Sequence, residues 1–281
     1  MQLSSHDIDA ICGLVIDLCG VYLDESKSYL IESRLGDLVK RSGCASYAEL
    51  ARRVRCAADH TLRNEVIDAI TTNETMFFRD QSPFEALQHR VIPELIDRKA
   101  LSLYPKRIRI WSAACSTGQE PYSIAMLVAE LIPDVHRWDV SILGTDISDV
   151  AISRASRGWY TNHEVERGLA AQRLERFFRR EAGGWQVNDA VRALVSFQHA
   201  NLLDPLAMKG KFDIIFCRNV AIYFTPETRH ELFHRLAAML LPDGYLFAGS
   251  QESLADLGPP FTPHHHCRAV FYRPNLRETL V

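Results

Sequence analysis

Two acidic residues lie beside short turns in the second half of the chain, where they could hold a ligand. Glu120 belongs to Ala113–Pro121, a stretch rich in small residues that separates a β-rich run from a long apolar run. Asp146 ends a second apolar run, DVSILGTD. Small residues let a ligand lie close to the backbone, and an acid at the end of such a strand commonly binds ribose hydroxyls. Glu120 also offers a carboxylate to a cationic group.

The glycine content of the first turn restricts the class of ligand. Only one glycine, Gly118, is present there, whereas a dinucleotide fold uses G-x-G-x-x-G and a phosphate-binding loop needs Gly-Lys-Ser/Thr. A ligand with a ribose, a positive charge and no phosphate suits both acids. S-adenosylmethionine (SAM) has these properties, so the pattern favours a SAM-dependent methyltransferase. Either carboxylate could instead cap a helix, so neither residue is specific by itself.

A third candidate segment, ITTNETMFFRD at residues 70–80, has neither a helical period nor a clean strand alternation. Polar residues lead into an apolar cluster that contains Phe77 and Phe78, and Arg79 follows directly. We expect the two phenylalanines to pack into a core and to anchor the segment, so that Arg79 is held in a defined direction.

The elements that must position these residues differ between the two halves of the chain. Up to about residue 70 the apolar residues recur at helical spacing, as in Ile11, Leu14, Val15 and Leu18, which predicts helices only. Beyond about residue 105, strands alternate with helices, which predicts a mainly parallel sheet covered by helices on both faces. The right-handed crossover then brings the loops after the strands to one edge, where ligands bind.

The predicted organisation has three parts. Residues 1–72 form an all-helical domain, residues 73–105 connect it to the next domain, and residues 106–281 form a SAM-binding domain. At about residues 159–200 a short helix, AAQRLERFF, and two strands, GGWQVND and ALVSFQHA, interrupt the alternation and predict an inserted antiparallel β-subdomain. The predicted fold class is α/β, a Rossmann-like methyltransferase domain with this insertion, preceded by a small all-α domain.

Five sequence blocks resemble, in the same order, the signature of the chemotaxis receptor methyltransferases, the CheR family: TTNETMFFRD, WSAACSTGQEPYS, GTDIS, ANLL and FCRNVAIYF. The resemblance spans nearly the whole chain. It implies a protein-glutamate O-methyltransferase that transfers a methyl group from SAM to glutamate side chains on the cytoplasmic coiled coil of chemoreceptors. The implied products are γ-methyl esters and S-adenosylhomocysteine, and the implied role is adaptation in bacterial chemotaxis.

The same resemblance implies that residues 73–105 are a linker that carries part of the cofactor site, and that the whole site is built from several separate segments. The implied cofactor-binding residues are Asn73, Thr75, Arg79, Glu120, Asp146, Asn201, Leu202, Asn219 and Val220. Glu74 receives no role, because other members of the family often carry other residues at this position.

Methyl transfer to a carboxylate needs little acid–base help, because a glutamate with a pKa of about 4.3 is already ionised at neutral pH. The enzyme must supply proximity and a dry pocket. Arg79 is the candidate catalytic cation, since a guanidinium can hold a carboxylate through paired hydrogen bonds, although it could instead bind the carboxylate of SAM. Tyr223 is the second catalytic candidate and could orient the substrate oxygen, with a core or rim position as the alternative.

Lys27, Arg34 and Arg41 are spaced by seven and therefore lie in one stripe of a predicted helix. They could form a solvated face, or a basic ridge that docks an acidic partner; the resemblance implies docking of the receptor. Some family members also grip a receptor's C-terminal peptide with the β-subdomain by strand addition. The turn in EAGGWQVND is short relative to those members, which favours an enzyme that does not use this tether.

The seven cysteines are scattered and include no CxxC pair, which indicates reduced thiols rather than a disulfide frame or a zinc site. The run from His264 to Cys267 has the residue types of a metal ligand set. Neighbours on an extended chain point to opposite faces, so we interpret this run as a rim or loop and predict no metal.

Composition restricts the partners and the location. A formal net charge of -3 argues against a generally nucleic-acid-binding surface. No apolar run approaches the roughly 18 residues of a membrane span, and the N-terminus does not read as a signal peptide, which predicts a cytoplasmic protein without membrane insertion. The expected partners are the cytoplasmic domains of chemoreceptors, with regulatory proteins of the pathway as further candidates.

Two other classes of protein remain as alternatives at this point. One is a non-catalytic SAM-binding or scaffold protein, against which the intact cofactor residues argue. The other is a methyltransferase for RNA or a small molecule. The acidic balance argues against it, as does RNVAIYF, which stands where an amine methyltransferase would carry an Asn-Pro-Pro-Tyr type motif.

Overall fold

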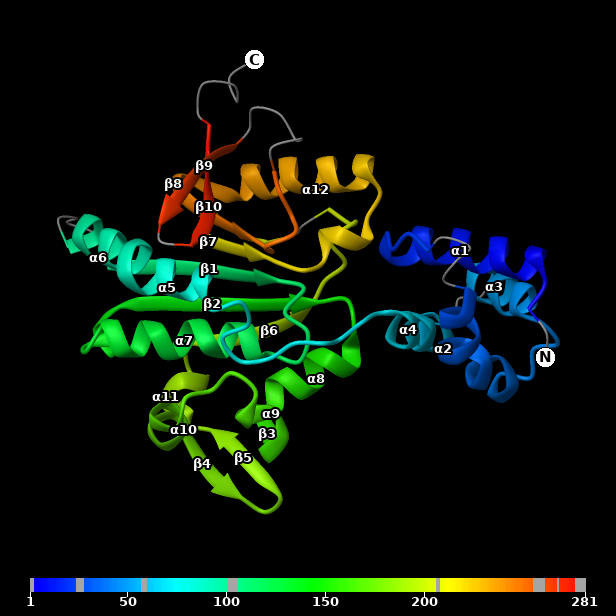
Figure 1. Cartoon of the computed structure of the whole chain (residues 1–281), viewed down its shortest axis with the longest axis horizontal. Coiled ribbons are helices and arrows are strands. Elements are labelled where there is room, and N and C mark those ends of the chain that lie inside the picture. Colours follow the sequence, from blue (N-terminus) through cyan, green and yellow to red (C-terminus); the bar gives the residue numbers. More distant parts are fainter. Residues whose placement is uncertain are drawn as a thin grey trace.

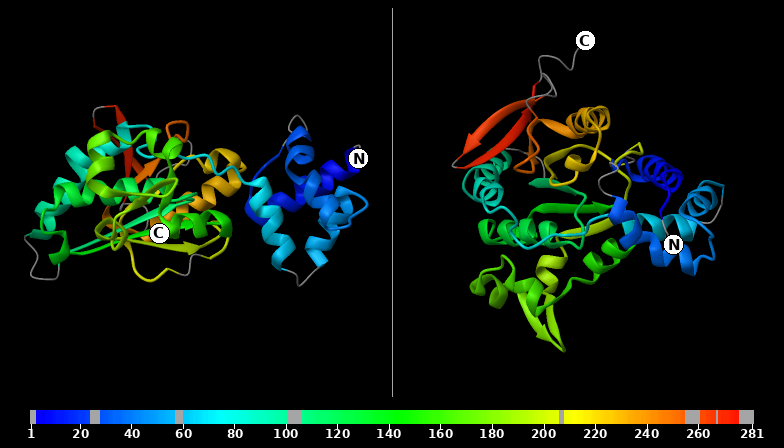
Figure 2. Two further views of the ribbon diagram at one scale, coloured as in Figure 1. Left: turned by 90° about the horizontal axis from the view of Figure 1, so that it is seen from below. Right: turned by 45° about the vertical axis from the view of Figure 1, so that its right-hand side comes forward.

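A small helical domain lies beside a larger α/β domain (Figure 1 and Figure 2). The computed structural model describes residues 3–23, 28–56, 60–100, 106–205, 208–254, 261–266 and 268–275. Within these ranges, the helices are all too short or too polar to cross a membrane.

Four helices form the N-terminal domain, as the periodicity predicts: α1 (Ser5–Cys19), α2 (Ser28–Arg41), α3 (Tyr47–Cys56) and α4 (His60–Ile70). The predicted apolar residues of α1 and α2, such as Leu14 and Leu35, are fully buried in one core. The hydroxyl of Ser4 and the carboxylate of Asp7 form a capping box that fixes the start of α1. These local signals explain why the helical part was predictable.

The α/β domain is built on a seven-stranded sheet with the order β6-β2-β1-β7-β8-β10-β9. The five strands from β6 to β8 run parallel, and β10 and β9 continue the sheet in antiparallel pairing. The strands are β1 (Arg107–Ala113), β2 (Asp139–Asp146), β6 (Val195–His199), β7 (Phe212–Cys217), β8 (Leu240–Ala248), β9 (Phe261–His266) and β10 (Ala269–Pro274).

Both faces of the central strands are covered, so their residues alternate between two cores. On β7, Ile214 and Phe216 belong to the core that contains α7 (Gln119–Leu131). Ile215 belongs to the opposite core with α12 (Pro226–Met239). Helix α8 (Asp149–Arg157) follows β2. The parallel order places the C-terminal ends of β1, β2 and β7 next to one another, facing the helical domain (Figure 1).

The segment that we expected to be a linker, residues 73–105, is helical over most of its described length. After an extended stretch, α5 (Ser82–Ala86), η2 (Leu87–Val91) and α6 (Ile92–Ala100) follow one another directly. Phe84 and Leu95 are buried in the same core as α7. Apolar residues at helical spacing explain this packing, so residues 82–100 belong to the catalytic domain.

The inserted unit contains a three-stranded antiparallel sheet of order β3-β5-β4. Its elements are β3 (Trp159–Thr161), α9 (Asn162–Glu166), α10 (Ala171–Phe177), β4 (Phe178–Glu181), β5 (Gly184–Val187) and α11 (Asp189–Arg192). The segment ALVSFQHA was also expected here, but its strand β6 pairs in parallel with β2 and belongs to the main sheet. A strand pattern shows that a segment is extended, and it does not reveal a distant pairing partner.

One contact between the inserted unit and the segment of Phe77 is especially close. Gly168 has a φ of +87°, and a Cβ there would lie 2.0 Å from the carbonyl oxygen of Phe77. We expect Gly168→Ala to lower the free energy of unfolding by about 2–3 kcal/mol in denaturant titrations, from backbone strain and the clash together. Gly183→Ala is the matched control, because its φ of +78° is similar but the nearest atom is 3.8 Å away. Equal losses in the two variants would contradict this close contact.

Candidate active site

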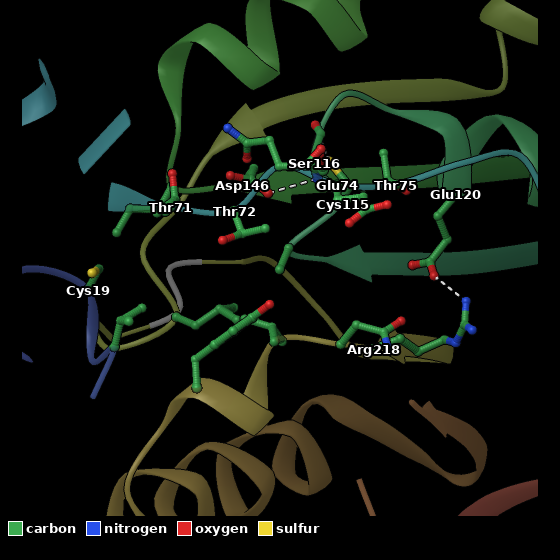
Figure 3. Close-up of a pocket in the computed structure, with 18 of the residues that line it drawn as sticks. Cys19, Thr71, Thr72, Glu74, Thr75, Cys115, Ser116, Glu120, Asp146 and Arg218 are labelled. Atoms are coloured by element: carbon green, nitrogen blue, oxygen red, sulfur yellow. Dashed lines mark hydrogen bonds and ion pairs between the residues drawn. The ribbon is translucent and has the colours of Figure 1, made fainter. Parts of the chain in front are cut away.

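A cavity of about 990 Å³, counting its open part, lies between the two domains at the C-terminal ends of the parallel strands (Figure 3). Its lining comes from the end of α1, the segment after α4, the turns after β1 and β2, and the loops before and after β7. The expected cofactor and catalytic residues all line this cavity: Asn73, Thr75, Arg79, Glu120, Asp146, Asn201, Leu202, Asn219, Val220 and Tyr223. The topology therefore brings together residues that are more than a hundred positions apart in the chain.

Asp146 is held rigidly at the end of β2. Its carboxylate accepts a hydrogen bond from the backbone N–H group of Ser116 at 2.8 Å (Figure 3). It also accepts the backbone N–H group of Ser148 at 3.0 Å. Burial raises the pKa of Asp146 above its ordinary value, and the two N–H donors offset part of this effect. A carboxylate has about four lone-pair positions, so acceptor capacity remains for a ligand in the cavity.

Glu120 is paired with a buried cation that the sequence reasoning did not single out. The guanidinium of Arg218, whose side chain is 1% exposed, donates to Glu120 at 2.9 Å and to Asp80 at 2.8 Å. The hydroxyl of Ser112 donates to the other oxygen of Glu120 at 2.7 Å. Arg218 stands directly before Asn219 in the block FCRNVAIYF, which was the available signal. Figure 3 shows the Glu120–Arg218 pair at one end of the cavity.

The loop after β7 is fixed by a second residue that the sequence reasoning missed. Glu252 is buried, and its carboxylate accepts the backbone N–H groups of five residues: Asn219, Val220, Ala221, Ile222 and Gly249. The distances range from 2.6 to 3.3 Å. Asn219 has a φ of +58°, a conformation that needs such support. No local motif marks Glu252, because four of its five partners lie about thirty residues earlier in the chain.

The segment after α4 is anchored as expected. Phe77 is fully buried against Tyr160 and Phe178, with ring centroids 5.0 and 5.6 Å apart. The N–H of Phe78 donates to the hydroxyl of Ser123 at 3.0 Å. Arg79 is half-buried and donates to the backbone carbonyl of Glu74 at 2.8 Å. The prediction that the two phenylalanines pack into a core is therefore confirmed.

Glu74, which received no role, makes an exposed ion pair with Arg167 of the inserted unit at 3.2 Å. Its side chain is 68% exposed, and such pairs contribute little to stability.

The N-terminal domain closes one side of the cavity. Cys19 and Val21 line it, and Figure 3 shows Cys19 on the side opposite Arg218. Asn201 donates from Nδ2 to the carbonyl of Leu18 at 2.9 Å and accepts the N–H of Leu203 at 3.0 Å. The amide of Asn201 therefore joins the two domains, in addition to any contact with a ligand.

The three residues of the predicted basic stripe differ in their surroundings. Lys27 lies outside the described residues. Arg34 donates to the carbonyl of Ile70 at 2.5 Å and to the hydroxyl of Thr72 at 3.1 Å, so it ties α2 to the segment that lines the cavity. Arg41 is exposed in the last turn of α2.

Cys115 and the histidine run supply no evident chemistry at this cavity. Burial, and secondarily the nearby carboxylates of Asp146 and Glu120, raise the pKa of the Cys115 thiol well above its ordinary value. His264 to His266 lie on the edge strand β9 rather than in a loop, and Cys267 is not among the described residues. In the part of the chain that the structure describes, no three histidine, cysteine or acidic side chains are placed to hold a metal ion.

The donor set of the cavity fits a ligand with a ribose and a cationic group. Asp146 and Glu120 are the buried or nearly buried carboxylates of the lining, and Leu202 and Val220 supply apolar surface. The turn after β1 has no glycine-rich phosphate cradle. The parallel sheet, its loop cluster and this donor set define a SAM-dependent methyltransferase.

Family models place the chain within this class more narrowly. Residues 6–71 match "CheR methyltransferase, all-alpha domain", and residues 73–267 match "CheR methyltransferase, SAM binding domain". The chain belongs to the CheR methyltransferase family, and its activity is SAM-dependent methylation in chemotaxis adaptation.

Relatives agree with this assignment over nearly their full length. The chain is 43% identical to "Chemotaxis protein methyltransferase Cher2" of Pseudomonas putida over 261 residues, covering 92% of this chain and 94% of that protein. It is 40% identical to "Chemotaxis protein methyltransferase 1" of Pseudomonas aeruginosa, covering 97% of this chain and 99% of that protein. The solved DhpI–SAH complex is 12% identical, covers 70% of this chain and 90% of that chain, and has a TM-score of 0.36, too low to carry an argument.

Proposed function

We propose that this enzyme methylates glutamate side-chain carboxylates on the cytoplasmic domains of chemoreceptors, giving γ-methyl esters and S-adenosylhomocysteine. The observation that carries the proposal is the convergence of Glu120, Asp146 and Arg79 on one cavity in a chain whose relatives are named chemotaxis protein methyltransferases. Because the proposed substrate is the cytoplasmic part of the receptor, the enzyme would act in the cytoplasm.

The proposed cofactor contacts follow from the chemistry of the lining. Asp146 would accept hydrogen bonds from the ribose hydroxyls, and Glu120 from the α-amino group. Leu202 and Val220 would contact apolar parts of the cofactor, with Asn73, Thr75, Asn201 and Asn219 as polar neighbours. SAM, when bound, supplies an electrophilic methyl group.

The protein's remaining task is to position the substrate carboxylate. That carboxylate is ionised at neutral pH, so no general base is required. Arg79 has five N–H donors, of which one reaches the carbonyl of Glu74. The rest of its guanidinium is available to hold a carboxylate, either of the substrate or of SAM, and the anchored phenylalanines fix its direction. Tyr223, 36% exposed on the cavity lining, is placed where it could meet the substrate oxygen.

The assay of this function is transfer of labelled methyl from SAM to chemoreceptor cytoplasmic fragments, followed by mild base. Release of volatile methanol from receptor glutamates supports carboxyl O-methylation. Label that is stable to base, or label only on RNA or small molecules, would refute the proposal. SAM binding without transfer to any fragment of a broad receptor panel would instead favour the scaffold alternative.

Arg79→Ala is expected to lower kcat/KM about 100-fold, because an oriented charge is lost from the reacting carboxylate. Tyr223→Phe should lower it about tenfold through loss of one hydrogen bond. Steady-state kinetics and SAM titration together separate the roles of Arg79: weaker SAM binding indicates contact with the cofactor carboxylate, and a fall in kcat alone indicates contact with the substrate. Near-normal turnover with unchanged SAM affinity in both variants would eliminate both assignments.

The basic stripe of Lys27, Arg34 and Arg41 is proposed to dock an acidic receptor surface. Arg41→Glu should raise the KM for receptor fragments about threefold to tenfold at low ionic strength, and the difference should shrink in high salt. Lys40→Glu makes the same charge change at an exposed neighbour paired with Asp37. Identical effects of the two variants, or no salt dependence, would contradict docking through the stripe.

A further inference from the structure

Exposed apolar side chains gather beside the mouth of the cavity. Six large apolar side chains are exposed in the described part of the chain, and three of them are Tyr22, Ile222 and Tyr223, with exposures of 51%, 46% and 36%. The N–H of Tyr22 donates to the carbonyl of Tyr223 at 2.7 Å, so the loop after α1 and the turn η4 (Ala221–Tyr223) lie side by side. We refer to these three residues as the rim.

The rim is held on a fixed backbone. The carboxylate of Glu252 accepts the N–H groups of Ala221 at 2.7 Å and Ile222 at 3.3 Å. The backbone hydrogen bond from Tyr22 to Tyr223 connects Tyr22 to this fixed turn. Apolar side chains held in water by a rigid backbone are typical of surfaces that bind a partner.

The rim also adjoins the cavity directly. Tyr223 lines the cavity, and Tyr22 and Ile222 are the chain neighbours of the lining residues Val21 and Tyr223. A glutamate side chain extends only about 5 Å from its Cα atom to its carboxylate, given ordinary bond lengths. A protein that inserts a glutamate into the cavity must therefore bring its own backbone and the neighbouring side chains against the surface around the mouth. A free small carboxylic acid would make no such contact.

Resting on the proposed function, we propose that the rim is the docking surface for the part of the receptor that carries the methyl-accepting glutamate. The side chains next to that glutamate must lie against the surface around the mouth, where Tyr22 and Ile222 are exposed. The partner is therefore a protein segment with apolar side chains beside the accepting carboxylate, and Tyr22 and Ile222 contact those side chains. Because this contact is apolar, its strength should not depend on ionic strength. This distinguishes it from docking through the charged stripe on α2.

The test uses the full-length enzyme and receptor cytoplasmic fragments. Tyr22→Ala and Ile222→Ser are each expected to raise the KM for the fragment at least about fivefold, with the SAM dissociation constant, the kcat at saturating receptor and the salt dependence unchanged. Tyr22→Phe keeps the ring and should retain the wild-type KM. Val270→Ala, an equally simple loss of an exposed apolar side chain on the distant strand β10, is the control and should have no effect.

Three results would overturn the proposal. An unchanged receptor KM in both variants removes the rim from docking. A parallel loss of SAM affinity assigns Tyr22 or Ile222 to the cofactor site. Loss of self-association in sedimentation, with an unchanged KM, makes the rim an interface between copies of this chain.

Failure of the proposed function can be distinguished from failure of the docking proposal, because in the first case the wild-type enzyme would form no base-labile ester. Direct binding of the fragment to wild type, Tyr22→Ala and Val270→Ala can still be compared in that case. Equal binding by all three would overturn the docking proposal as well.

Discussion

Replacing Arg218 with methionine is expected to lower the free energy of unfolding by about 3–5 kcal/mol and to weaken SAM binding at least tenfold. The side chain is 1% exposed and bonds to Glu120, Asp80 and the carbonyl of Arg79. Loss of the Arg218 side chain leaves the carboxylate of Glu120, which is only 12% exposed, without a positively charged partner. The effect on SAM follows because Glu120 and Arg79 both line the cavity. Denaturant unfolding and calorimetric titration with SAM measure the two effects.

Two variants make the Arg218 prediction specific. Arg167→Met removes a cation whose pairing with Glu74 is exposed, so it should cost less than about 1 kcal/mol. Arg218→Lys keeps the charge but cannot reach three acceptors in a fork, so it should recover only part of the loss. If Arg218→Met were as mild as Arg167→Met, the buried pair would not be organising the site.

Replacing Glu252 with glutamine is expected to cost about 3–4 kcal/mol of unfolding free energy and to reduce kcat/KM more than tenfold. The five N–H donors around the carboxylate require an acceptor on both oxygens. Glutamine places an NH₂ group against some of these donors and removes the charge that strengthens the other bonds. The loop that carries Asn219, Val220 and Tyr223 would then lose its fixed conformation. Urea unfolding, receptor kinetics and SAM titration report these effects.

Glu227→Gln provides a matched control, because Glu227 is an exposed carboxylate in the first turn of α12. It should change stability by less than about 0.5 kcal/mol. Glu252→Asp retains the charge but shortens the side chain, and it should recover stability only partly. A Glu252→Gln enzyme with wild-type stability and kinetics would show that the loop holds its shape without this carboxylate.

The sequence predicted those parts of the site that are encoded locally. The turn of Glu120 and the strand end of Asp146 could be located because each lies within one strand–turn–helix unit. The family resemblance then supplied the scattered residues, such as Asn201 and Asn219. Arg218 and Glu252 were missed because their roles depend on partners that are distant in the chain.

The errors in the fold have the same origin. Strand β6 was recognised as extended, but its parallel pairing with β2 crosses the whole inserted unit. We expected the stretch from Ser82 to Ala100 to be part of a linker, although its apolar residues recur at helical spacing, as in Phe84, Leu87 and Leu95. Its helical nature was therefore available from the sequence, whereas its packing against α7 required the fold.

Hydrogen bonds across the domain boundary couple the two domains around the cavity. Asn201 to Leu18, Tyr22 to Tyr223 and Ser148 to Asp68 all cross this boundary next to or near the cavity. A ligand between the domains binds only when both are folded and in contact. By mass action, saturation with such a ligand stabilises the helical domain as much as the sheet, so melting of the loaded enzyme should be one cooperative event. Any signal that pulls the helical domain away would release the ligand at the same time.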